Sequence, residues 1–205
     1  MTALRVGVLA SGAGTNLQAI LERVHGRQGV EVVAVGSDQP DAPALERAAR
    51  AGVETAVFAR EGYVDRAARD SAMADWLQAR GVGLVVLAGY MQLLSPGFLQ
   101  RFPGRVVNVH PALLPAFPGI RAIEQALAYG VKVFGVTVHF VDEGVDTGPI
   151  ILQRAIELPA ATEPEEVRAA LRPIEHDLLC EAVRLIARDA VRPDPSHPRR
   201  VLIAQ

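Results

Sequence analysis

Nearly continuous runs of apolar residues, many of them β-branched, recur along the first half of the chain. Such runs are typical of strands that are covered on both faces, as in a parallel sheet. They predict strands over residues 4–10, 30–35, 53–58, 84–88 and 106–109.

Stretches with a helical pattern separate these runs. Residues 16–24 follow Thr15, whose side chain suits the position just before a helix. Residues 42–51 end at Gly52, a favourable helix stop, and residues 65–80 form a third candidate. Strands and helices that alternate over short connections predict an α/β fold, with a doubly wound, mostly parallel sheet and right-handed crossovers.

The pattern changes after about residue 110. Apolar runs over 133–141 and 150–157 are joined by a loop rich in glycine and acidic residues, which predicts an antiparallel extension of the sheet. A long helical stretch follows over about 163–189, and Pro173 inside it predicts a kink, or a break with a new helix. The tail from Arg192 has three prolines within seven residues and is expected to be irregular.

The composition narrows the class of protein. Half of the 205 residues are hydrophobic and 21% are charged, which excludes a disordered chain. The net charge of −2 gives no electrostatic case for binding nucleic acid. The single cysteine, Cys180, excludes a cysteine-based zinc site and an internal disulfide. Without a signal peptide or a long apolar run, we expect a cytoplasmic protein with no membrane segment and a single domain over residues 1–205.

A glycine-rich loop, residues 11–16 (SGAGTN), lies between the first predicted strand and the first helix. Backbone N–H groups at a helix start suit a phosphate. The loop is not a P-loop, and Leu17 stands where a dinucleotide fingerprint has its third glycine. Asp38, after the second strand, could still bind a ribose. Phosphate binding, a dinucleotide site and an ordinary strand-to-helix turn therefore all stay open.

Polar residues follow the fifth predicted strand. Asn108 and His110 are two residues apart, so their side chains share one face of the strand. Ligands bind at the carboxyl ends of strands in open α/β sheets. There an amide and an imidazole could stabilise an oxyanion and transfer a proton. They could equally tie down the proline-rich loop 111–119 by hydrogen bonds.

The predicted hairpin adds further candidates. Asp142, Glu143 and Asp146 all lie in its loop, and the pattern alone does not choose among them. Thr137 and His139 share one strand face and could face the same site. No His-Glu-x-x-His occurs, and we expect no metal.

Four segments together resemble the phosphoribosylglycinamide formyltransferase family. The resemblance runs from about residue 4 to about residue 186. Its motifs are Ser11-Gly12-x-Gly14-Thr15-Asn16-Leu17, Leu87-Ala88-Gly89-Tyr90-Met91, Asn108-Val109-His110-Pro111-x-Leu113-Leu114-Pro115-x-x-Pro118-Gly119 and His139-Phe140-Val141-Asp142-x-Gly144-x-Asp146-x-Gly148-Pro149-Ile150.

This resemblance implies a Rossmann-like formyltransferase fold and an enzyme of de novo purine biosynthesis. It implies transfer of a formyl group from 10-formyltetrahydrofolate, as co-substrate, to the amine of glycinamide ribonucleotide, by a monomer or homodimer. Residues 1–110 would form a nucleotide-phosphate-binding half, 111–190 a folate-binding and catalytic half, and 191–205 a tail.

The resemblance also implies roles for single residues, and it chooses Asp146 among the three acids. In two positions the chain departs from the family pattern: Ala112 stands where serine is common, and Gln92 where some members have arginine. The implied catalytic residues are Asn108, His110 and Asp146, with possible support from His139 and Thr137; the phosphate residues are Gly14, Thr15 and Asn16; the ribose residue is Glu175; and the folate residues are Met91, Gln92, Leu93, Leu94, Val141, Asp142, Gly144 and Arg66.

Other functions remain as alternatives. Methionyl-tRNA formyltransferase and formyltetrahydrofolate deformylase share this core, but they usually carry a further C-terminal or N-terminal domain, for which the chain has little room. A nucleotide-binding module without catalysis would not need Asn108, His110 and Asp146 together. A dinucleotide oxidoreductase is disfavoured by Leu17.

Overall fold

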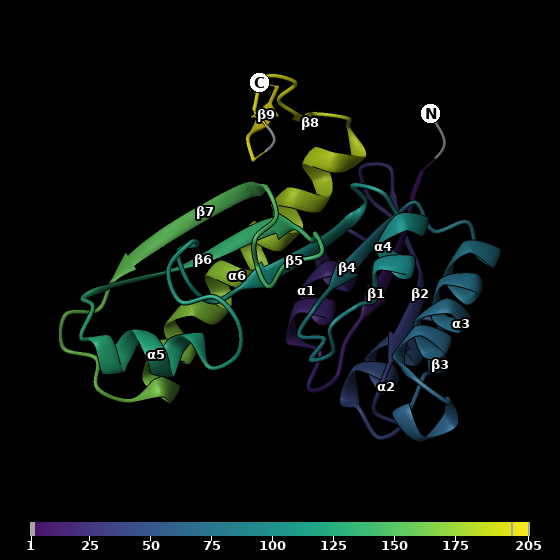
Figure 1. Cartoon of the computed structure of the whole chain (residues 1–205), viewed down its shortest axis with the longest axis horizontal. Coiled ribbons are helices and arrows are strands. Elements are labelled where there is room, and N and C mark those ends of the chain that lie inside the picture. Colours follow the sequence, from purple (N-terminus) through teal and green to yellow (C-terminus); the bar gives the residue numbers. More distant parts are fainter. Residues whose placement is uncertain (1–2, 198, 205) are drawn as a thin grey trace. The chain divides into compact units, whose positions relative to one another are not determined.

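The computed structural model describes residues 3–197 and 199–204 and divides into two compact units, Met1–Asn108 and Val109–Gln205 (Figure 1). The boundary falls inside strand β5 (Val106–His110), so that Asn108 ends the first unit and His110 lies near the start of the second.

The first unit is built on parallel strands, all of them predicted from the apolar runs. Their order is β3-β2-β1-β4-β5, and each neighbouring pair is parallel. Val6, Val8 and Val86 are fully buried, as expected for a sheet covered on both faces. Besides β5, the strands are β1 (Leu4–Leu9), β2 (Val30–Ser37), β3 (Glu54–Val57) and β4 (Leu84–Leu87).

Helices connect these strands. Thr15 was expected to cap the first helix from outside, but it is the first helical residue, and Gly14 takes the cap position without a side-chain bond. The sequence pattern also missed α4, although Ser95 and Pro96 signal its start: the Ser95 side chain accepts from Phe98 N and Pro96 occupies the first turn. The elements are α1 (Thr15–Arg23), α2 (Pro43–Arg50), the 3-10 turn η1 (Arg60–Gly62), α3 (Arg66–Ala79) and α4 (Pro96–Arg101).

The second unit contains the antiparallel pair β6 (Val133–Phe140) and β7 (Ile150–Glu157) that the hairpin pattern predicted. Helix α6 (Pro164–Ala187) packs on both strands. The pattern did not predict the short helix α5 (Ala122–Tyr129). The α/β class, mostly parallel with an antiparallel part, is confirmed.

Two expectations for the second unit were wrong in part. Helix α6 runs through Pro173 without interruption, so the chain does not start a new helix there. Its buried side chains flank the proline on both sides, from Val167 to Ile186, and tertiary packing of this face holds the helix together. The tail is irregular only in part, because β8 (Val191–Pro193) pairs antiparallel with β9 (Val201–Ile203), with turns and coil between them; residues 198 and 205 of the tail lie outside the described part.

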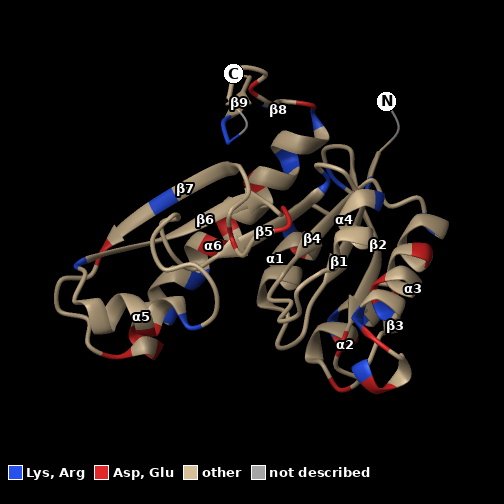
Figure 2. Cartoon of the chain, in the orientation of Figure 1, with Lys and Arg blue, Asp and Glu red and all other residues tan. Residues whose placement is uncertain are grey.

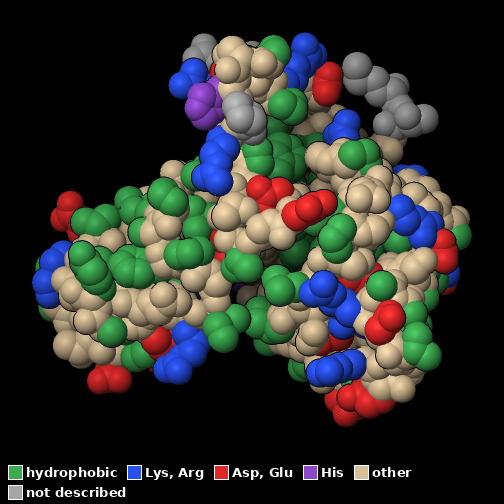
Figure 3. All heavy atoms as spheres, in the orientation of Figure 1, with side chains coloured by type: hydrophobic (Ala, Val, Ile, Leu, Met, Phe, Trp, Pro, Cys, Tyr) green, Lys and Arg blue, Asp and Glu red, His purple; other side chains and the backbone are tan. Residues whose placement is uncertain are grey.

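Charges of both signs are interspersed along the elements of each unit (Figure 2). On the face drawn in Figure 3, they lie among neutral and apolar side chains. Within residues 3–197 and 199–204, no helix combines the length and the apolar character needed to cross a membrane.

Candidate active site

The loop after β1 leads into the start of α1, with Gly14 at the junction. Gly14 has a φ of 69°, and a Cβ there would lie 2.7 Å from the Cβ of Ala44, so only glycine fits. Helix α2 holds the loop, because Ala44 N donates to Gly12 O over 3.2 Å and Arg47 Nε donates to Ala13 O over 2.8 Å. This arrangement places the predicted phosphate residues at a helix N-terminus, where backbone N–H groups favour an anion.

The predicted folate segment, residues 91–94, follows β4 and meets this loop. Ser11 N donates to Gly89 O over 3.1 Å, and Met91 N donates to Ser11 Oγ over 2.8 Å. The contact arises because β1 and β4 are parallel neighbours, whose carboxyl ends meet at the same edge. Met91 and Leu93 are 69% and 58% exposed, so their side chains are accessible to a ligand.

Asp38, the candidate ribose acid of a dinucleotide site, is only 5% exposed. Its Oδ1 accepts from Ser11 Oγ over 2.5 Å, and its Oδ2 accepts from Gln92 Nε2 over 3.0 Å and Gln39 Nε2 over 3.1 Å. Because both oxygens are used within the protein, this carboxylate has a structural task in the first unit.

At the end of β5, Asn108 lies opposite Leu87 of β4, and His110 follows two residues later. Both side chains therefore project from the same face of the strand. His110 is 4% exposed, and its Nε2 lies 2.8 Å from the carbonyl oxygen of Phe117. Phe117 has a φ of 52° and belongs to the proline-rich loop that the sequence showed.

The Asp146 carboxylate lies between two imidazoles of the second unit. Its Oδ2 is 3.3 Å from His110 Nδ1, and its Oδ1 is 3.5 Å from His139 Nε2. Gly119 N also donates to Oδ2 over 2.7 Å. The structure thus brings together three side chains that the sequence indicated, from β5, β6 and the hairpin loop.

The other two acids of the hairpin loop are placed differently. Asp142 Oδ1 accepts from Thr147 Oγ1 over 2.6 Å and from Gly144 N over 3.1 Å, so this side chain stabilises its own loop. Glu143 is exposed. Geometry therefore separates Asp146 from its two neighbours, which the sequence pattern could not do.

The charge of Asp146 follows from its surroundings. Burial raises its pKa, but the hydrogen bond with His139, the Gly119 N–H and the nearby charges of the two histidines outweigh burial and lower the pKa to about 2. The side chain is 13% exposed. Asp146 is therefore a carboxylate throughout the physiological pH range.

Thr137 is fully buried and holds the proline-rich loop. Its Oγ1 donates to Ala112 O over 2.7 Å and accepts from Leu114 N over 3.1 Å. Gln153 Nε2 donates to the same Oγ1 and to Leu114 O, each over 2.9 Å. The sequence pattern did not indicate Gln153; the hairpin register, which pairs it with Thr137, is the signal that could have found it.

Comparisons with known proteins fit this arrangement. The model of the family described as "Formyl transferase" matches residues 4–183.

The chain belongs to the formyl transferase family.

Named relatives and a solved structure narrow the group. The phosphoribosylglycinamide formyltransferase of Bacillus subtilis is 41% identical over 84% of this chain and 89% of its own length. The enzyme of the same name from Mycobacterium tuberculosis is 43% identical over 91% of this chain and 86% of its own length. Glycinamide ribonucleotide transformylase 1 from Symbiobacterium toebii has a TM-score of 0.95 at 49% identity, covering 99% of this chain and 95% of that one. The predicted resemblance, and with it the class of transferase, is confirmed.

The remaining predicted residues of this formyltransferase lie on several elements. Arg66 is exposed at the first position of α3, and Glu175 is half-buried in the middle of α6. Val141 and Gly144 belong to the loop after β6. In the described part of the formyltransferase, no cluster of three or more His, Cys, Asp or Glu side chains is arranged to hold a metal ion.

Proposed function

We propose that this formyltransferase moves the formyl group of 10-formyltetrahydrofolate to the amine of glycinamide ribonucleotide, a step of de novo purine biosynthesis. The names of the relatives support these substrates. The observation that carries the chemistry is the Asp146 carboxylate, which lies between His110 of β5 and His139 of β6.

In the proposed reaction the amine nitrogen attacks the formyl carbon. A new N–C bond forms while the carbonyl electron pair moves to oxygen, which gives a tetrahedral intermediate with an oxyanion. The Asn108 amide N–H and the ring of His110 share one strand face and are the proposed donors to this oxygen.

The contacts of His110 suit its doubly protonated form. Nδ1 faces the Asp146 carboxylate at 3.3 Å, and Nε2 faces the Phe117 carbonyl at 2.8 Å, so both nitrogens have an acceptor. An N–H on each ring nitrogen would satisfy both acceptors. The formyl oxygen would replace the Phe117 carbonyl as the acceptor of Nε2–H.

Asp146 acts mainly through its charge in this proposal. With a pKa of about 2 it is a weak base at neutral pH, but it is a constant partner for the imidazolium. Asp146 accepts the proton lost by the amine only transiently, either directly or through water. When the intermediate collapses, the C–N10 bond breaks and N10 takes up one proton, so the transfer is balanced.

The substrates are assigned by the resemblance together with the placement of the residues. Gly14, Thr15 and Asn16 at the start of α1 would hold the phosphate, and Glu175 the ribose. The proposed folate residues are Met91, Gln92, Leu93 and Leu94 after β4, Val141, Asp142 and Gly144 after β6, and Arg66.

The test is a turnover assay. The purified protein is incubated with 10-formyltetrahydrofolate, with and without glycinamide ribonucleotide, and tetrahydrofolate is followed spectroscopically. We expect product only when the amine is present. Absence of turnover with both substrates would contradict the proposal, and equal turnover without the amine would identify a deformylase.

A further inference from the structure

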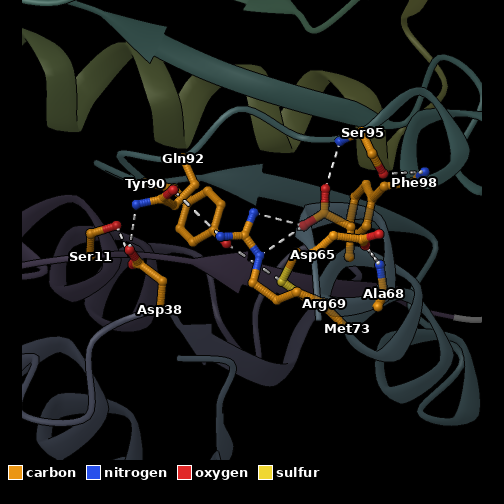
Figure 4. A network of polar contacts seen from close by, with 11 residues as sticks. Ser11, Asp38, Asp65, Ala68, Arg69, Met73, Tyr90, Gln92, Ser95 and Phe98 are labelled. Carbon is orange, nitrogen blue, oxygen red and sulfur yellow. Dashed lines mark hydrogen bonds and ion pairs between the residues drawn. The ribbon is translucent and has the colours of Figure 1, made fainter. Parts of the chain in front are cut away.

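One continuous chain of polar contacts in the first unit holds residues 91–95 at several points (Figure 4). At one end, Met91 N donates to Ser11 Oγ over 2.8 Å. At the other end, Ser95 N donates to Asp70 Oδ2 over 2.6 Å. Between these ends, the Gln92 side chain points back into the protein and completes the chain.

The interior of this chain contains buried charges. Arg69 and Asp70 are 3% and 0% exposed, and Arg69 donates from Nε and Nη2 to Asp70 Oδ1 over 3.0 and 2.8 Å. Asp38 is the third buried charge. Buried charges are stable only when they are paired and hydrogen-bonded, so each contact in this network matters.

Gln92 connects the two charged ends. Its Nε2 donates to Asp38 Oδ2 over 3.0 Å, and its Oε1 accepts from Arg69 Nη1 over 3.4 Å. An uncharged amide is the group that offers a donor and an acceptor at these two places. A carboxylate here would face Asp38 with like charge, and a cation would face Arg69 with like charge.

We propose that Asp38, Gln92 and Arg69 are positioning residues, which hold the backbone of residues 91–95 in the form that binds the folate co-substrate. This inference rests on the proposed function. Because the Gln92 side chain is used within the protein, the ligand would meet the backbone of the segment and the exposed side chains of Met91 and Leu93.

The first experiment separates positioning from general stability. Gln92→Met keeps the length of the side chain and removes both hydrogen bonds. We expect the KM for 10-formyltetrahydrofolate and the Kd for tetrahydrofolate, measured by calorimetry, to rise about tenfold, since the segment loses its hydrogen bonds to two charged groups. We expect kcat and the KM for glycinamide ribonucleotide to stay within about twofold. Gln100→Met, on α4, is the matched control and should change nothing.

The second experiment is a rescue. Gln92→Glu puts a carboxylate against Asp38, and Asp38→Asn removes the negative charge that accepts from Gln92 Nε2, so each single variant should bind tetrahydrofolate about tenfold more weakly. In the double variant, the new amide at position 38 would donate to the new carboxylate at position 92, which still accepts from Arg69. The double variant should regain binding to within about threefold of wild type, a coupling that independent sites do not show.

The outcomes distinguish the two proposals. If tetrahydrofolate binds Gln92→Met as tightly as wild type, or if the double variant binds no better than the single ones, the positioning role is wrong. If the wild-type protein lacks amine-dependent turnover while the binding changes follow this pattern, the proposed function fails and the positioning role stands. If Gln92→Met does not fold, the double variant alone decides the matter.

Discussion

The network around Gln92 in the first unit and the cluster around Asp146 in the second both contain buried carboxylates, but the partners of those carboxylates differ. Around Gln92, a neutral amide stands between Asp38 and Arg69, and the carboxylates accept from hydroxyl, amide, guanidinium and backbone donors. Around Asp146, one carboxylate is shared by two imidazoles at 3.3 and 3.5 Å. The first arrangement fixes a backbone segment, whereas the second maintains a negative charge between two imidazole rings.

The largest effect should come from Asp146→Asn. Without the carboxylate, His110 Nδ1 loses its charged partner and the site loses a proton-accepting group, so kcat should fall about 1,000-fold, within the range for lost acid–base groups. Steady-state kinetics measure the change. Glu143→Gln, in the same loop but exposed, is the control and should retain wild-type turnover. If Asp146→Asn retained wild-type turnover, the proposed role of the Asp146 cluster in the reaction would be wrong.

Loss of a proposed oxyanion donor should have the next largest effect. Asn108→Ala or His110→Ala should lower kcat about 100- to 1,000-fold, because each removes one donor to the developing charge. The far-UV spectrum should stay close to wild type, which shows that the fold is kept. A variant at either position with nearly full turnover would contradict the assignment.

Arg69→Met tests the network around Gln92 and should lower the stability of the fold. It leaves the Asp70 carboxylate buried without its cation, so the free energy of unfolding should fall by about 3 kcal/mol or more. Urea unfolding measures this loss. Arg101→Met removes a more exposed ion pair with Asp75 and should cost at most about 1 kcal/mol. Equal losses in both variants would show that the Gln92 network is not a stabilising element.

The smallest effect concerns pH. The pKa of Asp146 falls from 3.8 to about 2 on folding, so its ionised form stabilises the folded state above about pH 4. This contribution, about 2 kcal/mol, is lost as the pH falls through 2. The difference in unfolding free energy between wild type and Asp146→Asn should therefore shrink as the pH falls from about 4 to 2. A constant difference down to pH 2 would contradict the charge assigned to Asp146.

Much of the fold could be predicted because the apolar runs and turn residues act locally. The parallel strands, the hairpin and the positions of Asn108 and His110 on one strand face all followed from periodicity. Helix α4 was missed because its 6 residues are too short for a clear period. Helix α5 has the same length as the predicted α2, but its start carries no signal, because Arg121 at the N-cap makes no side-chain bond and no proline occupies the first turn. The new helix expected at Pro173 does not occur, because the low helix propensity of one residue is weaker than the packing of a whole helix face.

For the candidate site, the sequence by itself supplied the residue types, through motifs whose spacing resembles one family. The resemblance also chose Asp146, but only the tertiary structure showed why, because Asp142 bonds within its own loop while Asp146 lies beside His110. The tertiary structure alone placed the Phe117 carbonyl and the Gly119 N–H, and turned the Gln92 side chain toward Asp38 and Arg69. The physical reason is that these contacts join residues far apart in sequence, or use backbone groups that every residue has. Periodicity reports which face a residue occupies, whereas only the packed loops determine which groups come within hydrogen-bonding distance.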